Sequence, residues 1–198
     1  MAKILALVRS NWPVLVCVLV VLAGRSSLAD HYIVPSGSME PTLVPGDRVL
    51  VDKMSFGIRL PFSEIVLIPG RSPQAGDVVI FDSPEDGIRL IKRVVALAGD
   101  LVELHGGRLQ INGQSLSDAD GTPEEHFTAG SARISLAHGG GRDFGPTTVP
   151  AGHLMVLGDS RGNSRDSRYF GFIEVDDLYA RATRVFYRSD DGFVWLPL

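Results

Sequence analysis

The chain has few residues that could form disulfides or bind a metal ion. Its 198 residues include one cysteine, Cys17, so no disulfide can form within the chain. The five histidines show no metal-ligand spacing, and each reads as a surface or loop residue. A formal net charge of -4 lacks the basic footprint of a nucleic-acid-binding protein. We therefore expect no metal, no nucleic-acid partner and no disulfide framework.

Turn-forming residues are abundant. The sequence holds 22 glycines and 12 prolines together with many valines, isoleucines and threonines, a composition that favours short strands separated by turns. The length suits one domain, or one domain with a small insertion. No internal repeat interrupts this pattern.

The N-terminal segment is apolar and flanked by basic residues. Residues 10–24 carry no charge, Lys3 and Arg9 precede them, and Arg25 follows. A membrane anchor and a cleaved signal peptide ending at the small-x-small site 27–29 both fit, whereas a buried core helix would need a polar face. Both a membrane anchor and a signal peptide place the rest of the chain outside the cytoplasm. The excess of positive charge before the run keeps the N-terminus cytoplasmic.

A stretch of turn residues, PSGSMEPTL at 35–43, cannot continue a helix or sit in a central strand. It predicts a sharp turn that holds serine hydroxyls out of the backbone ladder. One interpretation is an ordinary turn in which these hydroxyls bond nearby amides. The other is that Ser38 is a nucleophile and that Ser36 assists its chemistry.

A strand predicted at 88–96 carries a lysine on its apolar face. Period-two alternation places Lys92 with isoleucine, leucine, valine and alanine side chains, and it places Arg89 and Arg93 on a face that we expect to be partly solvated. Burial disfavours the ammonium and can make such a lysine a base near neutral pH. The alternative is a lysine that simply reaches solvent.

Three further segments complete the pattern. The apolar stretch 56–68 is either a core hairpin or an exposed edge that meets the bilayer surface. Residues 113–145 are polar and predict a loop. The stretch GDSRGNSRDSRYFGF at 158–172 also reads as a loop, tied by a pair such as Asp166 and Arg168. Arg161 and Arg165 stand where a calcium loop would need oxygen ligands.

Four stretches in this order closely resemble the type I signal peptidases, which use a Ser-Lys dyad. They are PSGSMEPTL (35–43), GDRVLV (46–51), GDVVIF with IKR (76–81 and 91–93), and the stretch 158–172. The family's last motif usually has asparagine and aspartate where this chain has Ser160 and Gly162. The resemblance covers the catalytic core and leaves the middle of the chain and the C-terminus weakly matched.

The resemblance implies a role for each matching residue. Ser38 is the nucleophile, Lys92 is the general base, Ser36 contributes to the oxyanion hole and Ser164 orients the lysine. Four charged residues are expected to support the structure rather than the chemistry: Asp159, Arg161, Asp166 and Arg168. Five residues flank the catalytic ones and are candidates for shallow substrate pockets: Val34, Pro35, Met39, Leu43 and Ile91.

The resemblance also implies an architecture and a setting. We expect a mainly β protein with a β-barrel or sheet catalytic core at 30–99 and 145–198, a small inserted lobe at 100–144, and one N-terminal transmembrane helix within 1–29. The expected partners are preproteins with signal peptides and membrane lipid. No cofactor is expected, and the protein is expected to be monomeric. It would be a single-pass protein of the bacterial inner membrane with its catalytic domain on the outer face.

Other functions remain open on the sequence alone. A Ser-Lys peptidase with a narrow substrate range would carry the same motifs. A Ser-His-Asp hydrolase is disfavoured because no G-x-S-x-G elbow is present. An anchored binding module that has lost activity is the alternative outside enzymes, but it would have no reason to keep both Ser38 and Lys92.

Overall fold

The computed structural model describes residues 12, 14, 29–59, 66–118 and 122–198. Almost all of the predicted anchor at 1–29 and the middle of the predicted hairpin at 56–68 therefore lie outside the described residues. Among the described residues, no helix has the length and apolar character needed to cross a membrane. The assignment of an anchor stays a prediction.

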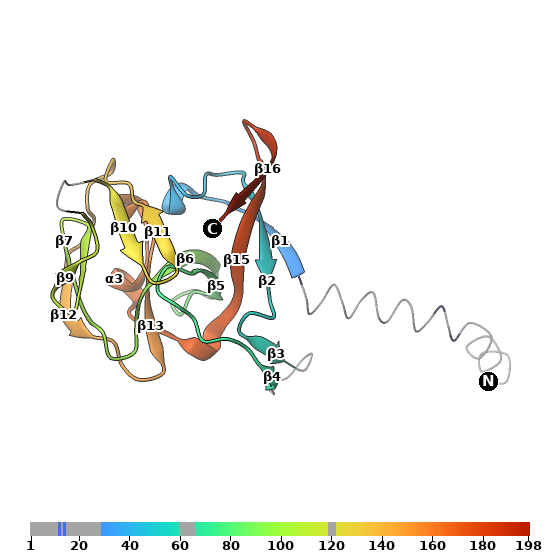
Figure 1. Ribbon diagram of the computed structural model, residues 1–198, viewed down its shortest axis with the longest axis horizontal. Helices are drawn as coiled ribbons and strands as arrows, with labels where there is room; N and C mark the ends of the chain where they lie inside the picture. The colour runs from blue at the N-terminus through green and yellow to red at the C-terminus, as the bar shows by residue number, and fades with distance from the viewer. Residues whose placement is uncertain (1–11, 13, 15–28, 60–65, 119–121) are drawn as a thin grey trace.

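One large sheet organises the molecule (Figure 1). Its strands follow the spatial order β1-β2-β15-β5-β6-β13-β14, and β16 pairs with β15 off this path. The path ends at β1 and β14 without joining them, so the described strands form an open sheet and not a closed barrel. Their bounds are β1 Ala29–Ile33, β2 Arg48–Asp52, β5 Val78–Asp82, β6 Arg89–Leu97, β13 His153–Leu157, β14 Ile173–Glu174, β15 Leu178–Arg188 and β16 Gly192–Pro197.

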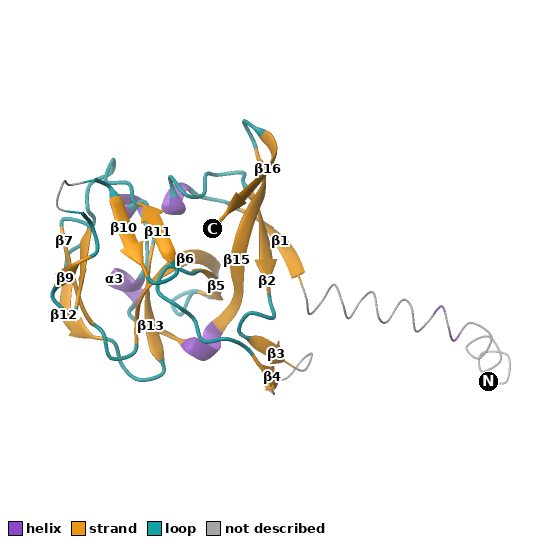
Figure 2. Cartoon of the chain, viewed as in Figure 1, coloured by secondary structure: helices purple, strands orange, loops and turns teal. Residues whose placement is uncertain are grey.

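Three smaller sheets flank the large one (Figure 2). A four-stranded sheet has the order β12-β7-β8-β9, and two hairpins are formed by β10 with β11 and by β3 with β4. Their bounds are β3 Gly57–Arg59, β4 Val66–Pro69, β7 Leu101–His105, β8 Arg108–Ile111, β9 Gln114–Ser115, β10 Glu124–Phe127, β11 Gly130–Arg133 and β12 Phe144–Thr148.

The loop predicted at 113–145 was wrong, because β9, β10, β11 and the start of β12 lie there. These strands are short and mostly polar, and β10 and β11 each bury a single residue, Glu125 and Ala132. One buried residue per strand gives no visible alternation, so the hydrophobic pattern could not reveal them. The boundary of an inserted lobe at 100–144 stays a prediction.

The core lies on both faces of the large sheet. In β5 the apolar run is buried on both faces, with Val78 and Ile80 in one cluster and Val79 and Phe81 in another. A third cluster joins Val95 and neighbouring large-sheet residues to Val102, Leu104 and Leu109 of the four-stranded sheet. The two sheets thus share apolar packing.

Short helical turns occupy the two motif stretches. The serine turn contains the 3-10 helix η1, Gly37–Met39. The stretch predicted as a loop at 158–172 contains η2, Arg161–Asn163, and one α-helical turn, α3, Ser167–Phe170. The Asp166 side chain accepts a hydrogen bond from the Arg168 amide and so caps α3. A further turn, η3, spans Val175–Asp177.

Candidate active site

The serine turn is supported from beneath by the core. Met39 and Leu43 are fully buried in the cluster that also contains Val34 and Val49. The Leu43 amide donates to the Met39 carbonyl at 2.9 Å, and the Ser160 amide donates to the Ser38 carbonyl at 3.1 Å. These contacts fix the turn that carries Ser38 without occupying its hydroxyl.

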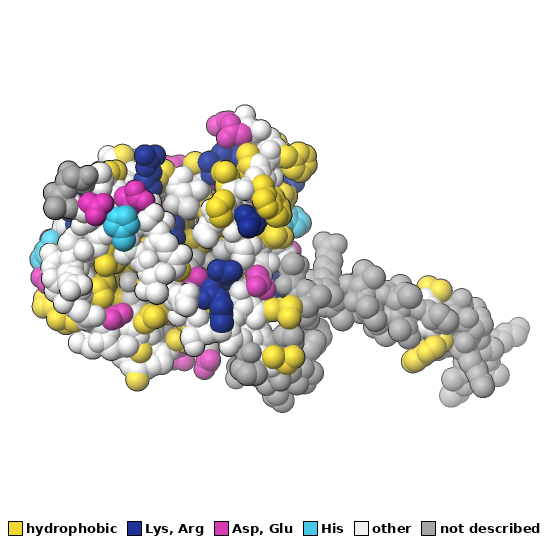
Figure 3. All heavy atoms as spheres, in the orientation of Figure 1, with side chains coloured by type: hydrophobic (Ala, Val, Ile, Leu, Met, Phe, Trp, Pro, Cys, Tyr) yellow, Lys and Arg dark blue, Asp and Glu magenta, His cyan; other side chains and the backbone are white. Residues whose placement is uncertain are grey.

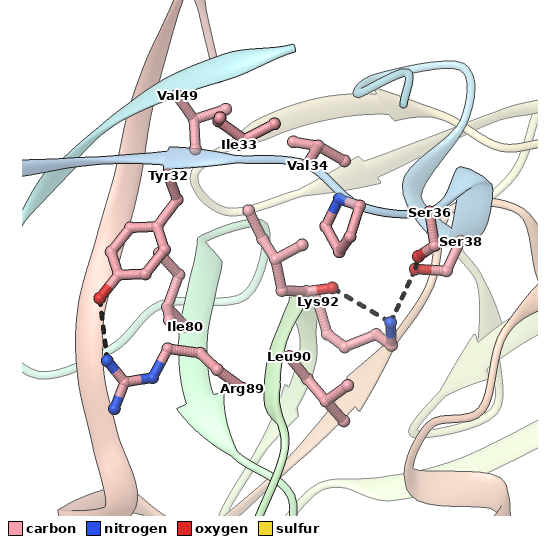
Figure 4. Close-up of a pocket in the computed structure, with 12 residues that line it drawn as sticks. Tyr32, Ile33, Val34, Ser36, Ser38, Val49, Ile80, Arg89, Leu90 and Lys92 are labelled. Atoms are coloured by element: carbon pink, nitrogen blue, oxygen red, sulfur yellow. Dashed lines mark hydrogen bonds between the residues drawn. The ribbon is translucent and has the colours of Figure 1, made fainter. Parts of the chain in front are cut away.

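Lys92 contacts Ser38 within this turn. Lys92 lies on β6 opposite Val79 of β5, and only 3% of it is exposed. Its Nζ donates to Ser38 Oγ at 2.8 Å and to the Ile91 carbonyl at 3.1 Å (Figure 4). Ser36 Oγ lies 3.4 Å from Ser38 Oγ. Three residues named from the sequence therefore come together, from β6 and from the loop after β1.

The buried lysine has the ionisation that a base requires. Removal from water lowers the pKa of the Lys92 ammonium from 10.5 to about 8, although the charges of Asp166 and Asp159 oppose the shift and Arg168 adds to it. A substantial fraction of Lys92 is thus neutral near physiological pH. A neutral amine at 2.8 Å can accept the proton of the Ser38 hydroxyl.

The expectation for the opposite face of β6 was wrong at Arg93. Arg89 is exposed, but Arg93 is 4% exposed and forms a bidentate pair with Asp159 at 2.9 and 2.7 Å. Strand β6 pairs with β5 up to Arg93 and with β13 from Arg93 onward, and consecutive residues 92–96 are buried on both faces. Alternation alone cannot distinguish a solvated arginine from one that a buried carboxylate neutralises.

The pair of Arg93 and Asp159 also links the segments that carry Lys92 and Ser38. Asp159 Oδ2 accepts a hydrogen bond of 2.5 Å from Thr42 Oγ1, which lies at the end of the serine turn. Arg93 is the residue after Lys92, so one carboxylate ties the strand that carries Lys92 to the turn that carries Ser38. Asp159 was expected to support the structure, whereas Thr42 and Arg93 were not singled out.

The other expected support residues form buried ion pairs. Asp166 accepts from Arg168 at 2.7 and 2.8 Å, as the sequence suggested, and both side chains are fully buried. Arg161 is 1% exposed and pairs with Glu125 of β10, whose side chain is 0% exposed. The partner Glu125 was missed because it lies in the stretch that was expected to be a loop.

Ser164 lies beside this network but makes no bond to the lysine in this structure. Its Oγ is buried and has no hydrogen-bond partner among the described residues. A Cβ on Gly158 would overlap both Ser164 Oγ and the Ser38 carbonyl. Glycine at 158 therefore lets the backbone segments that carry these two serines approach each other. Gly162 has a similar role, since a Cβ there would overlap the His138 carbonyl.

A small cavity adjoins the dyad (Figure 4). Its volume is about 110 Å³. A water in the liquid takes roughly 30 Å³, so the cavity suits small side chains. Twelve residues line it: Tyr32, Ile33, Val34, Pro35, Ser36, Ser38, Val49, Ile80, Arg89, Leu90, Ile91 and Lys92.

The structure places three of the five pocket candidates at this cavity. Val34, Pro35 and Ile91 line the cavity, but Met39 and Leu43 do not, because their side chains pack into the core beneath the turn. Six lining residues were not among the site residues named from the sequence: Tyr32, Ile33, Val49, Ile80, Arg89 and Leu90. They come from β1, β2, β5 and β6, and the sequence gives no sign of which strands become neighbours.

The chain is similar to known proteins. Residues 7–187 match the family model for signal peptidase, peptidase S26. Signal peptidase I of Pseudomonas fluorescens is 42% identical over 82% of this chain and 61% of its own length. Signal peptidase I of Leptolyngbya laminosa is 32% identical over 83% of this chain and 72% of its own.

A solved structure is also similar. A crystal structure of signal peptidase I from Enterococcus faecalis is 34% identical, with a TM-score of 0.43, and the match covers 56% of this chain and 97% of that one. The chain spans about three fifths of the length of its Pseudomonas relatives, which match over 61% of their residues. With most of its length matched by the family model, the chain belongs to the signal peptidase family, peptidase S26.

Proposed function

We propose that this protein is a membrane-anchored serine endopeptidase that removes N-terminal signal peptides from exported preproteins. The observation that carries the proposal is the hydrogen bond of 2.8 Å between Lys92 Nζ and Ser38 Oγ, made by a buried lysine in a member of this family. A small cavity beside the dyad fits a cut after Ala-x-Ala-like residues. No metal or cofactor takes part in the proposed reaction.

The reaction begins with attack of Ser38 Oγ on the scissile carbonyl while neutral Lys92 accepts the hydroxyl proton. Collapse of the tetrahedral intermediate breaks the peptide bond, and Lys92 returns the proton to the leaving amine. The acyl-enzyme ester on Ser38 is then hydrolysed by a water that Lys92 deprotonates. This sequence is the Ser-Lys variant of the serine-protease mechanism.

Two serines assist these steps in the proposal. Ser36 Oγ, at 3.4 Å from Ser38 Oγ, is placed to donate to the developing oxyanion together with the Ser38 amide. Ser164 has a buried hydroxyl without a partner, and we assign to it the orientation of Lys92 once substrate is bound.

The substrate binds as an extended strand. Among the described strands, β1 pairs only with β2, and residues 89–92 of β6 pair with β5 but not with β13. Both free edges border the cavity, so their backbone groups are available to an added strand. In an extended peptide, alternate side chains then enter the cavity.

Cleavage of a preprotein with alanines at the cut provides the direct test of the function. In detergent, the wild-type protein should cleave it, Ser38→Ala should give no cleavage, and Ser36→Ala should lower kcat by about 10²- to 10³-fold. Thr148→Ala, at an exposed position on β12, is a control that should retain activity. Cleavage that survives Ser38→Ala would contradict the mechanism.

The range of substrates separates this proposal from its alternatives. A general signal peptidase cleaves many unrelated preproteins, whereas a specialised Ser-Lys processing peptidase cleaves one. An inactive anchored binding module cleaves none and still binds. A panel of preproteins assayed with the same preparation distinguishes the three.

The pH dependence follows from the lowered pKa of Lys92. The neutral fraction of a group with a pKa of about 8 is about one tenth at pH 7 and about nine tenths at pH 9. We expect kcat/KM to rise about tenfold over this range, with its midpoint near pH 8. A profile that is flat from pH 7 to 9 would exclude Lys92 as the base.

The membrane setting is also a proposal. We infer a single pass, with the N-terminus in the cytoplasm and the catalytic domain at the outer face of a bacterial inner membrane, acting as a monomer. Exposed apolar side chains gather over β16 (Figure 3), where Phe193 is 88% exposed and Trp195 is 63% exposed. An adjacent hollow is lined by Asp30 and His31 at the start of β1, just after the predicted anchor. Lipid is the partner that this position suggests.

Tryptophan fluorescence can locate Trp195. The chain has two tryptophans, so the Trp12→Phe variant reports on Trp195 alone. In lipid vesicles we expect blue-shifted emission that lipids with brominated acyl chains quench, because an indole prefers the bilayer interface. Emission typical of water, unaffected by brominated lipid, would place β16 away from the membrane.

A further inference from the structure

The segment that carries Ser38 lies outside the sheets. It runs over residues 34–47, between the end of β1 and the start of β2, and a backbone hydrogen bond of 2.9 Å from Val34 to Asp47 closes its base. Lys92, in contrast, lies within β6, where strand pairing with β5 fixes its backbone. The distance between Ser38 and Lys92 therefore depends on what holds the inner part of this segment.

Two hydrogen bonds join the inner part of the segment to the loop after β13. The Ser160 amide donates to the Ser38 carbonyl at 3.1 Å. The Thr42 hydroxyl donates to Asp159 Oδ2 at 2.5 Å. The first bond is made by backbone atoms and does not depend on a side chain, whereas the second requires the hydroxyl of Thr42.

The Thr42 hydroxyl lies between two buried charged groups. Arg93 and Asp159 form the bidentate pair described above, and both side chains are buried. Thr42 Oγ1 donates to the carboxylate and accepts a hydrogen bond of 3.3 Å from Arg93. A hydroxyl can donate and accept at the same time. The side chain of Thr42 is therefore bound both to the loop after β13 and to β6.

The backbone of Thr42 is held from a third direction. Its carbonyl accepts a hydrogen bond of 3.2 Å from Arg188 at the end of β15. Arg188 is itself paired at 2.7 Å with Asp47, which is fully buried. Thr42 thus connects the serine turn to β15 through its backbone and to β6 through its side chain.

The short reach of a general base gives these contacts a chemical consequence. Lys92 Nζ and Ser38 Oγ are 2.8 Å apart, and Thr42 follows Ser38 by four positions. A general base acts within roughly 2.6–3.2 Å of the group whose proton it accepts. Displacement of the turn by about 1 Å would take Ser38 out of this range, and a misplacement of that size can lower a rate by about 10²-fold.

We propose that Thr42 is a positioning residue that holds Ser38 within reach of Lys92 through its hydrogen bond to Asp159. This inference rests on the proposed peptidase function. Because the twelve residues that line the cavity do not include Thr42, we expect its loss to lower kcat and to leave KM nearly unchanged. Serine keeps the hydroxyl and should replace threonine, whereas valine keeps only the shape and should not.

Side-chain replacements at Thr42 test the proposal. We would measure kcat and KM for the whole chain in detergent, with the preprotein that has alanines at the cut. Thr42→Val should lower kcat by about 10- to 100-fold and change KM by less than about twofold. Thr42→Ser should keep kcat within about threefold of wild type. Thr183→Val is the matched control, because it removes a hydroxyl that donates to the Leu50 carbonyl at 3.1 Å, and it should keep the wild-type kcat.

Each outcome decides the proposal. An equal kcat in wild type and Thr42→Val, or a loss that appears only in KM, overturns it and leaves the peptidase function intact. An equal loss of kcat in Thr183→Val also overturns it, because the effect would then follow from removing any such hydroxyl. If Thr42→Val does not fold, equal kcat values for Thr42→Ser and Thr42→Ala overturn it. If wild type does not cleave the preprotein, the peptidase function fails, and the role of Thr42 fails with it.

Discussion

Replacing Lys92 with methionine should abolish peptide cleavage and at the same time stabilise the fold. Loss of the base leaves Ser38 a weak nucleophile, and we expect kcat to fall by about 10⁴-fold or more. The gain in stability arises because a charged lysine that is 3% exposed is costly to bury. Lowering its pKa from 10.5 to about 8 corresponds to about 3 kcal/mol of unfolding free energy at pH 7.

The pH at which unfolding is measured tests the cause of this gain. The pKa of Lys92 in the folded protein, about 8, lies below the value of 10.5 expected in the unfolded chain. Between these values the unfolded chain binds more protons, so wild-type stability rises with pH. The advantage of Lys92→Met should therefore be full below pH 8 and should disappear as pH approaches 10.5.

Denaturant unfolding at pH 7 and pH 10 measures this difference. Lys53→Met is the matched control, because Lys53 pairs with Asp30 at 3.0 Å and its pKa is not lowered. That control should not gain stability at either pH. A Lys92→Met variant that is less stable than wild type at pH 7 would mean that the amine contributes more by its bonds to Ser38 and Ile91 than its burial costs.

Ser38 and Lys92 could be named because their local sequences resemble motifs of the type I signal peptidases, whereas composition and alternation alone left an ordinary turn and a solvent-reaching lysine open. The turn at 35–43 has a composition that allows few other conformations, and the alternation around Lys92 gives its face on the strand. The partners of the support residues could not be predicted in this way. Glu125 pairs with Arg161 across 36 positions, and Arg93 pairs with Asp159 across 66, and nothing local in either stretch identifies the other.

Among the strands, too, some could be predicted from the sequence and others could not. The strand predicted at 88–96, which has a clear apolar pattern, agrees with β6 to within one residue at each end. The polar strands β10 and β11 were missed, because their contribution to the core is one buried residue each. The place of Tyr32 at the cavity depends on the pairing of β1 with β2, which the sequence does not reveal.

The buried pair between Arg161 and Glu125 should be the most sensitive structural point among the support residues. Glu125→Gln leaves the Arg161 guanidinium, 1% exposed, without its counter-charge. Breaking a buried pair from one side costs about 3–5 kcal/mol, and we expect a loss of this size in the free energy of unfolding. Denaturant unfolding monitored by circular dichroism provides the measurement.

Two comparisons give this prediction its meaning. The double variant Glu125→Leu with Arg161→Met removes both charges, so it should recover part of the loss, although the Gly158 and Gly107 carbonyls lose the donor they share in Arg161. Glu85→Gln breaks an exposed pair with Arg165 and should change stability little.

Because Arg161 follows Asp159 and precedes Ser164 in the same loop, Glu125→Gln should also lower kcat without touching the dyad. Equal losses for Glu125→Gln and Glu85→Gln would show that burial of the pair is not what holds this loop in place.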